Sequence, residues 1–543
     1  MSARGAKVTR MNRETQRAEL HKTIWRIAND LRGSVDGWDF KQYVLGFLFY
    51  RYISENLTDY LNALEHEAGN SDFDYARLAN RDVEDPDLAR DIVAEKGGFF
   101  IRPSELFANV RARAPPRDPN LNETLDRAFR NIEGGSAVGT VAENDLKGLF
   151  DDIDVNSNKL GPTVAKRNER LVKLLDAIGD LNLGNGSFTE NKIDAFGDAY
   201  EYLMQMYASS AGKSGGEYYT PQEVSELLAR ITVVGKTSVN KVYDPACGSG
   251  GSLLLKYRKV LGKDGGVRQG GYYGQEINLT TYNLCRINMF LHDVNYEHFD
   301  IAHGDTLIDP AHWDDEPFEA IVSNPPYSIK WEGDANPLLI NDPRFAPPAG
   351  VLAPKSKADL AFTMHMLSWL AVNGTAAIVE FPGGVLYRGG GAEQKIRKYL
   401  IDNNYVDAVI QLPPDLFFGT TIATCIIVLK KSKNDNAVLF IDASAEFVRG
   451  GNKNKLTEAN QARILEAFTA REDVAHFARL VENEAIGENG YNISVSSWVE
   501  AEDTREVVDI TELNARIAGI VERQAALRAQ IDAIVADLEG ADA

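Results

Sequence analysis

In the second half of the chain, short β-rich runs alternate with stretches of helical pattern. The runs lie at residues 241–243, 271–275, 301–303, 320–322, 376–380, 406–411, 422–429 and 438–441. Strands that alternate with helices favour an α/β domain, in which a mostly parallel, doubly wound sheet carries helices on both faces. Ligands of such sheets bind beyond the carboxyl ends of the strands, so functional residues are expected there.

The chain ahead of this region is predicted to be mainly helical. Apolar residues recur at helical spacing near its start and are followed by a glycine that ends the helix: Leu20, Ile24, Ile27, Leu31 and Gly33. Further helices are expected at residues 39–56, 121–130 and 161–178, with loops and short helices at residues 69–119. We divide the chain into a helical domain (1–207), a linker of Gly, Ser, Ala and Lys (208–216), the α/β domain (217–485) and a tail (486–543).

The tail carries a long apolar stripe. The stripe steps by threes and fours over about four heptads, with Gln524 at its one polar position. Its apolar members are Ile510, Leu513, Ile517, Ile520, Leu527, Ile531, Ile534 and Leu538. A helix that packs on its own domain is one interpretation. The length and regularity of the stripe favour the other, a helix that docks on a partner or forms a coiled coil.

Composition excludes some classes of protein. A length of 543 residues predicts two or three domains, and the formal net charge of −21 argues against a protein that coats nucleic acid with its whole surface. A local basic cleft, or a partner that makes the phosphate contacts, stays open. Three cysteines, Cys247, Cys285 and Cys425, form neither a disulfide framework nor a metal cluster, and no metal site is expected. With no secretory signal or membrane span in the sequence, we expect a cytoplasmic protein.

A glycine-rich turn, VYDPACGSGG at residues 242–251, follows the first run and precedes a helical pattern. Glycines let the backbone turn tightly and let a ligand approach the main chain. Exposed N–H groups at the start of the helix favour a carboxylate or a phosphate. The turn lacks the Lys-Ser/Thr of a phosphate loop and departs from the dinucleotide pattern, so alone it could serve any nucleotide or be structural.

Three acids stand at the ends of three successive runs: Asp244, Glu276 and Asp305. At the tip of the second strand, Glu276 is placed to hold ribose hydroxyls. Asp305, after the third run, could accept a hydrogen bond from an adenine amino group. One such acid is usually a turn residue, but the repetition favours a nucleoside-binding site.

The segment GEYYTPQE, residues 216–223, opens a helix. Thr220 and Glu223 fit a capping box, and Pro221 fits the first helical position. One interpretation is a well-capped helix alone. The other is that the turn from Glu217 to Gln222 closes over a cofactor, with Tyr218 or Tyr219 packed against it.

The segment AIVSNPPY, residues 320–327, is the most informative part of the sequence. Prolines fix the backbone and leave carbonyl groups without neighbouring N–H donors. The side-chain oxygen of Asn324 and the carbonyl of Pro325 could then both accept from one exocyclic amino group, and Tyr327 could stack on a planar base. This arrangement suits a base that has been flipped out of a duplex. A plain Asn-Pro turn with a core tyrosine is the alternative.

Together these motifs resemble a known family. DPACGSGG, GQE, GDTL and NPPY, preceded by GEYYTP, resemble the amino-methyltransferases that use S-adenosylmethionine, and their order is similar to the gamma class of DNA adenine methylases. The whole chain resembles the M subunit of type I restriction–modification systems. The resemblance extends over residues 28–54 and over ADLAFTMHMLSWL, AIVEFPGGVLYRGG and DAVIQLPPDLFFGTTIATCIIVL. NPPY alone is less specific, because protein glutamine methyltransferases carry it too.

The resemblance implies a Rossmann-like S-adenosylmethionine-dependent methyltransferase domain that methylates adenine at N6 in DNA, with no metal requirement. It assigns the target base to Asn324, Pro325, Pro326 and Tyr327. It assigns the cofactor to Glu217, Tyr218, Tyr219, Thr220, Pro221, Gln222, Asp244, Gly248, Ser249, Gly250, Gly251, Glu276 and Asp305. Ala246 and Cys247 are expected to be packing residues.

The resemblance also implies partners: double-stranded DNA, a specificity subunit that reads the sequence, a second copy of the chain, and a restriction subunit whose presence stays open. The alternatives are a stand-alone or other defence-system DNA methylase, a protein glutamine or RNA methyltransferase, and a non-catalytic cofactor sensor. The insert from Trp331 to Ala358, with Arg344, Lys355 and Lys357, is interpreted either as a mobile loop near DNA or as a surface loop without contacts.

Overall fold

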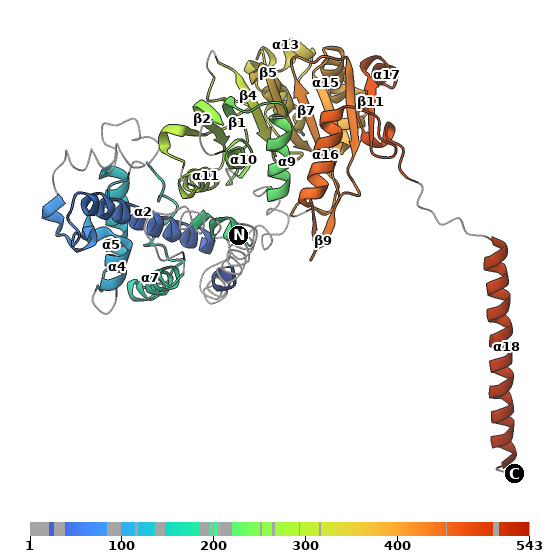
Figure 1. Cartoon of the computed structure of the whole chain (residues 1–543), viewed down its shortest axis with the longest axis horizontal. Helices are drawn as coiled ribbons and strands as arrows, with labels where there is room; N and C mark the ends of the chain where they lie inside the picture. Colours follow the sequence, from blue (N-terminus) through green and yellow to red (C-terminus); the bar gives the residue numbers. More distant parts are fainter. Residues whose placement is uncertain are drawn as a thin grey trace, which may run out of the picture. The chain divides into compact units, whose positions relative to one another are not determined.

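The computed structural model describes most of the chain. The described residues are 21–25, 39–83, 99–114, 118–135, 147–181, 183, 196–197, 199–204, 206, 220–249, 252–262, 266–292, 294–313, 316–418, 420–451, 453–502 and 510–541. The chain divides into two units, Met1–Val499 and Glu500–Ala543, and each is described by itself. Figure 1 labels the helices and strands.

A nine-stranded sheet forms the centre of the first unit, in the order β11-β8-β6-β7-β5-β4-β1-β2-β3. Its strands are β1 (Val239–Asp244), β2 (Val267–Glu276), β3 (Phe299–His303), β4 (Phe318–Ser323), β5 (Leu370–Glu380), β6 (Val406–Gln411), β7 (Cys425–Lys430), β8 (Ala437–Asp442) and β11 (Ala478–Glu482). Each predicted run lies within one of these strands or, for residues 422–429, overlaps it.

The prediction of a mostly parallel sheet is confirmed. β1 pairs in parallel with β2 and β4, β2 with β3, β4 with β5, and β6 with β8. β7 runs antiparallel between β5 and β6, and β11 lies antiparallel on β8. A short antiparallel hairpin, β9 (Val448–Gly450) with β10 (Lys453–Lys455), follows β8. β11 and this hairpin were not predicted, because their short runs, interrupted by charged and polar residues, show no clear β pattern.

Helices cover both faces of the sheet, as expected of a doubly wound domain. α9 (Gln222–Thr232), α10 (Ser252–Leu261), α11 (Leu279–Leu291) and α16 (Glu458–Ala470) bury residues in one core cluster. α14 (Asp359–Trp369), α15 (Gly391–Asp402) and α17 (Asn483–Glu488) bury residues in a second. Figure 1 shows α9 and α16 side by side. Successive residues of β1 alternate between the clusters, Val242 in the first and Tyr243 in the second, because side chains of a strand alternate in direction.

The helical prediction for the first part of the chain is confirmed where the structure describes it. α2 (Asp39–Glu67) continues past the predicted end at residue 56, and is followed by α4 (Phe107–Arg113), α5 (Leu121–Gly135) and α7 (Val164–Gly179). Between α2 and α4, the described residues include three short 3-10 turns: η1 (Tyr75–Arg77), η2 (Asn80–Val83) and η3 (Pro103–Glu105). The rings of Phe49 and Phe99 pack against Phe290 of α11, so the helices share a core with the sheet domain.

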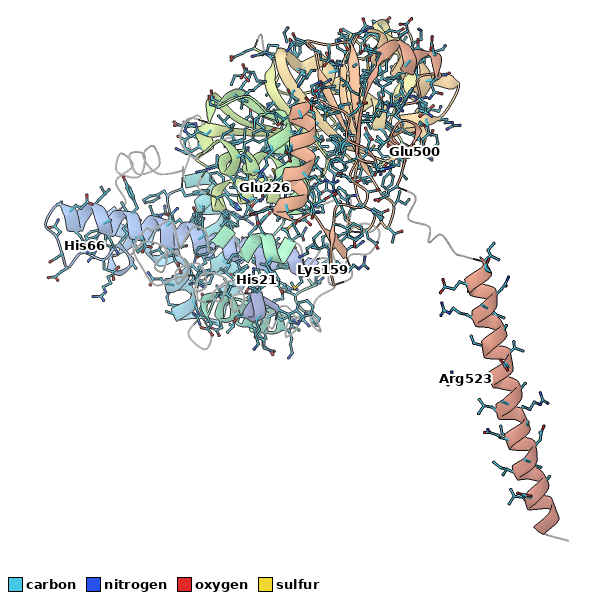
Figure 2. The ribbon with its side chains drawn as sticks, turned by 45° about the vertical axis from the view of Figure 1, so that its right-hand side comes forward. His21, His66, Lys159, Glu226, Glu500 and Arg523 are labelled. Carbon is cyan, nitrogen blue, oxygen red and sulfur yellow. The ribbon has the colours of Figure 1, made fainter. Side chains whose placement is uncertain are left out.

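The second unit contains α18 (Ile510–Ala541), a helix of 32 residues. The predicted helix through the heptad stripe is confirmed. Figure 2 shows side chains projecting all round it, Arg523 among them. A search of the described helices finds none that is long and apolar enough to cross a membrane.

Candidate active site

The four functional residues predicted from the sequence lie at or just after the carboxyl ends of neighbouring strands. Asp244 ends β1, Glu276 ends β2, Asp305 follows β3, and Asn324 follows β4. These four strands are parallel and adjacent, so their carboxyl ends share one edge of the sheet. The strand order changes direction between β1 and β4, the kind of position where open α/β sheets bind ligands.

The glycine turn after β1 is held by two carboxylates. Oδ1 of Asp244 accepts from the N–H of Ala246 at 3.0 Å and from the hydroxyl of Ser323 at 2.9 Å. Oε2 of Glu276 accepts from the N–H of Gly248 at 3.0 Å. Gly248 has a φ of 58°, a left-handed conformation that favours glycine. Ser249 is fully buried. Gly250 and Gly251 lie outside the described residues.

Asp244 retains an unused acceptor. Its side chain is 1% exposed, and no described residue donates to Oδ2. Burial raises the pKa of Asp244 to about 7, and the charge of Glu276 adds to the shift. Burial also raises the pKa of Glu276. A buried carboxylate oxygen without a donor is costly, so this turn suits a ligand that is cationic or donates hydrogen bonds.

Asp305 shapes the turn after β3. Its Oδ1 accepts from the N–H of Leu307 at 2.9 Å. The hydroxyl of Thr306 donates to the carbonyl of Pro245 at 2.6 Å, which joins this turn to the glycine turn. The structure therefore brings Asp244, Glu276 and Asp305 to one set of connected turns.

Arg344 lies beneath the Asp305 turn. Its side chain is 5% exposed, and its guanidinium donates to the carbonyls of Thr306 and Leu307, both at 2.8 Å. It also pairs with Asp342 at 2.7 Å. Arg344 is therefore a buried structural residue rather than a surface cation of the insert, because a buried guanidinium needs these acceptors. The insert is also packed rather than loose: Trp331 donates to the carbonyls of Lys355 and Pro354.

A buried histidine connects Arg344 to β1. Nδ1 of His365 lies 3.1 Å from Arg344, and Nε2 lies 3.0 Å from the hydroxyl of Tyr243. Because arginine can only donate, Nδ1 must accept, and the proton of the neutral ring is on Nε2. Burial and the charge of Arg344 lower the pKa of His365. The cluster Asp342–Arg344–His365–Tyr243 thus supports both the Asp305 turn and the tip of β1.

The side chain of Asn324 is held at both ends of its amide. Nδ2 donates to the hydroxyl of Thr220 at 3.0 Å, and Oδ1 accepts from the hydroxyl of Tyr327. The side chain is 9% exposed. Pro325, which follows, is buried and has no N–H of its own. The amide is therefore fixed in orientation next to Asp244, to which the preceding Ser323 is bonded.

Aromatic rings surround Tyr327. The ring of Phe381 stacks on it with centroids 4.1 Å apart, and the ring of Phe417 meets it edge-on at 6.5 Å. Burial raises the pKa of Tyr327, with Glu380 adding to the shift, so the phenol keeps its proton. Phe381 and Phe417 were not predicted as site residues. Their only sequence signal is that each follows a strand run, and the sequence does not reveal that β5 and β6 lie on this side of β4.

The capping box predicted at Thr220 and Glu223 is wrong. α9 begins at Gln222, its N-cap is Pro221, and no side chain caps it. The hydroxyl of Thr220 instead accepts from Asn324, a residue 104 positions away, so a tertiary contact replaces the local one. Glu217, Tyr218 and Tyr219 lie outside the described residues.

The cysteines are structural in character. Cys247, Cys285 and Cys425 are buried free thiols, and a hydrogen bond with Cys285, together with burial, raises the pKa of Cys247. Within the described ranges, no group of three or more His, Cys, Asp or Glu side chains is arranged to hold a metal ion.

Known proteins are similar to this chain in both sequence and fold. A family model described as N-6 DNA Methylase matches residues 191–507, and one described as HsdM N-terminal domain matches residues 20–178. A type I restriction enzyme methylase subunit of Mycoplasma pneumoniae is 49% identical over 97% of each chain. One from Methanocaldococcus jannaschii is 30% identical over 90% of this chain and 79% of its own. A crystal structure of a type I methyltransferase subunit from Streptococcus thermophilus superposes with a TM-score of 0.79 at 36% identity, covering 89% of this chain and 100% of that one.

The chain belongs to the N-6 DNA methylase family, and is an S-adenosylmethionine-dependent enzyme that methylates DNA adenine at N6. Within that family it belongs to the methylase subunits of type I restriction enzymes. Methylation of protein glutamine or of RNA is thereby set aside. The residues fit the cofactor: S-adenosylmethionine carries an ammonium and a sulfonium charge, and the turn after β1 offers a buried carboxylate oxygen to which no described residue donates.

Proposed function

We propose that Asn324 and Pro325 hold the amino group of a flipped-out adenine while Tyr327 stacks on its ring. The supporting observation is the fixed amide of Asn324, anchored by Thr220 and Tyr327 beside the cofactor turn. An amide oxygen has two lone pairs, so Oδ1 can accept from the adenine amino group while it keeps or exchanges its bond to Tyr327.

In this proposal the protein acts by positioning and electrostatics. S-adenosylmethionine would supply an electrophilic methyl group: the bond from this methyl to sulfur breaks as its bond to the adenine nitrogen forms, and the nitrogen then releases one of its protons to solvent. Asn324 and the carbonyl of Pro325 draw on the amino protons, which directs the nitrogen lone pair out of the ring plane. Pro326 stiffens the turn.

The cofactor residues take separate roles. Asp244 receives the ammonium group of S-adenosylmethionine, and Glu276 holds its ribose. Asp305 accepts from the amino group of the cofactor's own adenine. The glycine turn lets the cofactor approach the main chain of Gly248, Ser249, Gly250 and Gly251. The segment from Glu217 through Tyr218, Tyr219, Thr220 and Pro221 to Gln222 closes over the cofactor. Thr220 supports this arrangement because its hydroxyl already joins that segment to Asn324.

The affinity for S-adenosylmethionine is expected to rise with pH. The pKa of Asp244 is raised to about 7, and only the ionised carboxylate attracts the ammonium group. Below about pH 7 the affinity should therefore increase about tenfold per pH unit, and it should level off above. Calorimetric titrations across a pH series measure this. Asp244→Asn should bind weakly with most of the pH dependence gone; an unchanged slope in that variant would assign the titration elsewhere.

The raised pKa of Asp244 also affects the stability of the cofactor-free protein. This stability should fall as the pH rises, whereas the affinity for the cofactor should increase. The folded pKa of Asp244 lies above the unfolded value of about 4, so its contribution is fully present at low pH and is lost as the pH rises through about 7. The cofactor favours the ionised form. It should therefore raise the melting temperature more at about pH 8 than at about pH 6, a difference that Asp244→Asn should remove.

Arg344→Gln is expected to weaken cofactor binding. Arg344 positions the Asp305 turn through two backbone carbonyls, so its loss should raise the KM for S-adenosylmethionine roughly tenfold or more, with kcat at saturation little changed. Lys355→Gln, an exposed cation on the same insert, is the matched control. Equal losses in kcat and affinity would indicate general damage to the fold rather than positioning of the turn.

We further propose that a specificity subunit binds α18, and that two copies of the chain enclose the duplex in a cytoplasmic complex to which a restriction subunit can add. The supporting observations are the net charge of −21, which favours a partner that makes most of the phosphate contacts, and the exposed apolar stripe of α18. In this proposal, residues 1–207 clamp the partner or the DNA and are joined by the linker 208–216 to residues 217–485, which catalyse methyl transfer. Residues 486–543 dock on the specificity subunit.

The test is transfer of labelled methyl groups to DNA by the chain alone and with its co-expressed specificity subunit, with the product nucleoside identified. N6-methyladenine formed only with the partner is the expected result. The same product from the chain alone would contradict the dependence on a specificity subunit.

A further inference from the structure

The β9–β10 hairpin, residues 447–455, is a basic projection on an acidic chain. It carries Arg449, Lys453 and Lys455 and no acidic residue, whereas the chain as a whole has a net charge of −21. Val448 is 47% exposed, and the neighbouring Phe447 is exposed as well. Figure 1 shows β9 extending past the lower end of α16, away from the body of the sheet. A two-stranded ribbon this short is not stable alone, so its neighbours must hold it.

The neighbour that holds the hairpin is the loop after β6. Asn454 donates from its backbone to the carbonyl of Asp415 at 3.1 Å and from Nδ2 to that of Pro414 at 2.8 Å. Nζ of Lys453 donates to the carbonyl of Phe417 at 2.8 Å. Arg449 pairs with Asp415 at 3.2 Å. The hairpin and this loop therefore form one connected piece.

That piece adjoins Tyr327, the residue proposed to stack on the target base. Phe417, whose carbonyl Lys453 holds, meets the ring of Tyr327 edge-on. The hairpin also follows β8, which is parallel to β6, so it leaves the sheet at the edge that carries Asp244 and Asn324. A duplex that delivers its base to Tyr327 must pass its backbone over this edge.

We propose that the β9–β10 hairpin binds the phosphate backbone next to the target adenine, with Arg449 and Lys455 on the phosphates and Val448 against the sugars. The inference rests on the proposed function, since it needs the duplex over the strand ends. Backbone contacts carry no sequence information. The hairpin therefore adds affinity and orientation, and leaves the choice of site to the partner.

The test measures how duplex binding by the full complex depends on salt. The slope of log K against log salt concentration is negative, and each phosphate contact adds about 0.9 to its magnitude. Arg449→Gln with Lys455→Gln should therefore reduce that magnitude by about two for each copy of the chain that touches DNA. This reduction of the slope should be equal for target and non-target duplexes. Lys455→Gln alone, which leaves the Arg449–Asp415 pair intact, should reduce the magnitude of the slope by about one.

The matched control is Lys395→Gln, the same loss of charge at an exposed position of α15. It should leave the slope unchanged. Unchanged cofactor affinity in every variant shows that the fold is intact. A hairpin variant with the slope of the wild type, or of Lys395→Gln, would overturn the proposal. Methylation by the wild-type complex tests the proposed function separately, because it does not depend on the slope.

Discussion

Asn324→Ala should abolish methyl transfer while binding S-adenosylmethionine with nearly wild-type affinity. The amide is the group that aims the adenine nitrogen, and removing one preorganised hydrogen-bonding group typically costs about 10²–10³-fold in rate. Here the loss should be about a thousandfold or more, because Tyr327 and Thr220 also lose their shared partner. Single-turnover transfer of labelled methyl groups, beside calorimetric titration of the cofactor, measures both quantities.

Two other variants define the division of labour. Glu276→Ala should weaken cofactor binding, since its carboxylate holds the glycine turn through Gly248. Asn373→Ala is the control for Asn324→Ala, because it makes the same substitution at an exposed position of β5. It should change neither the rate of methyl transfer nor the affinity for the cofactor. If Asn324→Ala, Glu276→Ala and Asp244→Ala all bind the cofactor equally well, or if Asn324→Ala keeps its rate, the assignment fails.

Removal of residues 505–543 should stop assembly with the specificity subunit and leave cofactor binding intact. The helix exposes a row of large apolar side chains to solvent: Ile510, Leu513, Ile517, Ile520, Leu527, Ile531, Ile534 and Leu538. Burial of one such side chain stabilises by about 1.5–3 kcal/mol, so the stripe would supply much of the affinity of a complex. Co-purification and light scattering of the two subunits measure assembly.

Point variants separate the stripe from the rest of α18. Ile517→Lys with Leu527→Lys places charges in the stripe and should disrupt assembly as strongly as the deletion. Glu522→Lys changes charge on the opposite side of the helix and should be tolerated. Full assembly of the truncated chain would show that the partner binds elsewhere.

The parts predictable from sequence were those that depend on neighbours along the chain. Asp244, Glu276, Asp305 and Asn324 could be placed at a common edge because each follows a strand run, and parallel strands end together. The long helix of the tail was likewise visible in its periodicity.

What the sequence could not provide depends on strand order and burial. The partner of Thr220 is Asn324 rather than its own helix, which no local pattern reveals. Arg344 looked like a surface cation because its acceptors, the carbonyls of Thr306 and Leu307, are backbone atoms. Phe381 and Phe417 join the site only because β5 and β6 lie beyond β4, with β7 inserted between them.

Photo-crosslinking shows whether the target adenine is flipped out of the duplex onto Tyr327. A duplex with 5-iodouracil in place of the target adenine is bound by the full complex and irradiated, and the linked peptide is identified by mass spectrometry. If the base is flipped out onto Tyr327, a crosslink forms at Tyr327 and is lost in Tyr327→Ala. Efficient crosslinking at another residue, with none at Tyr327, would contradict that position of the base.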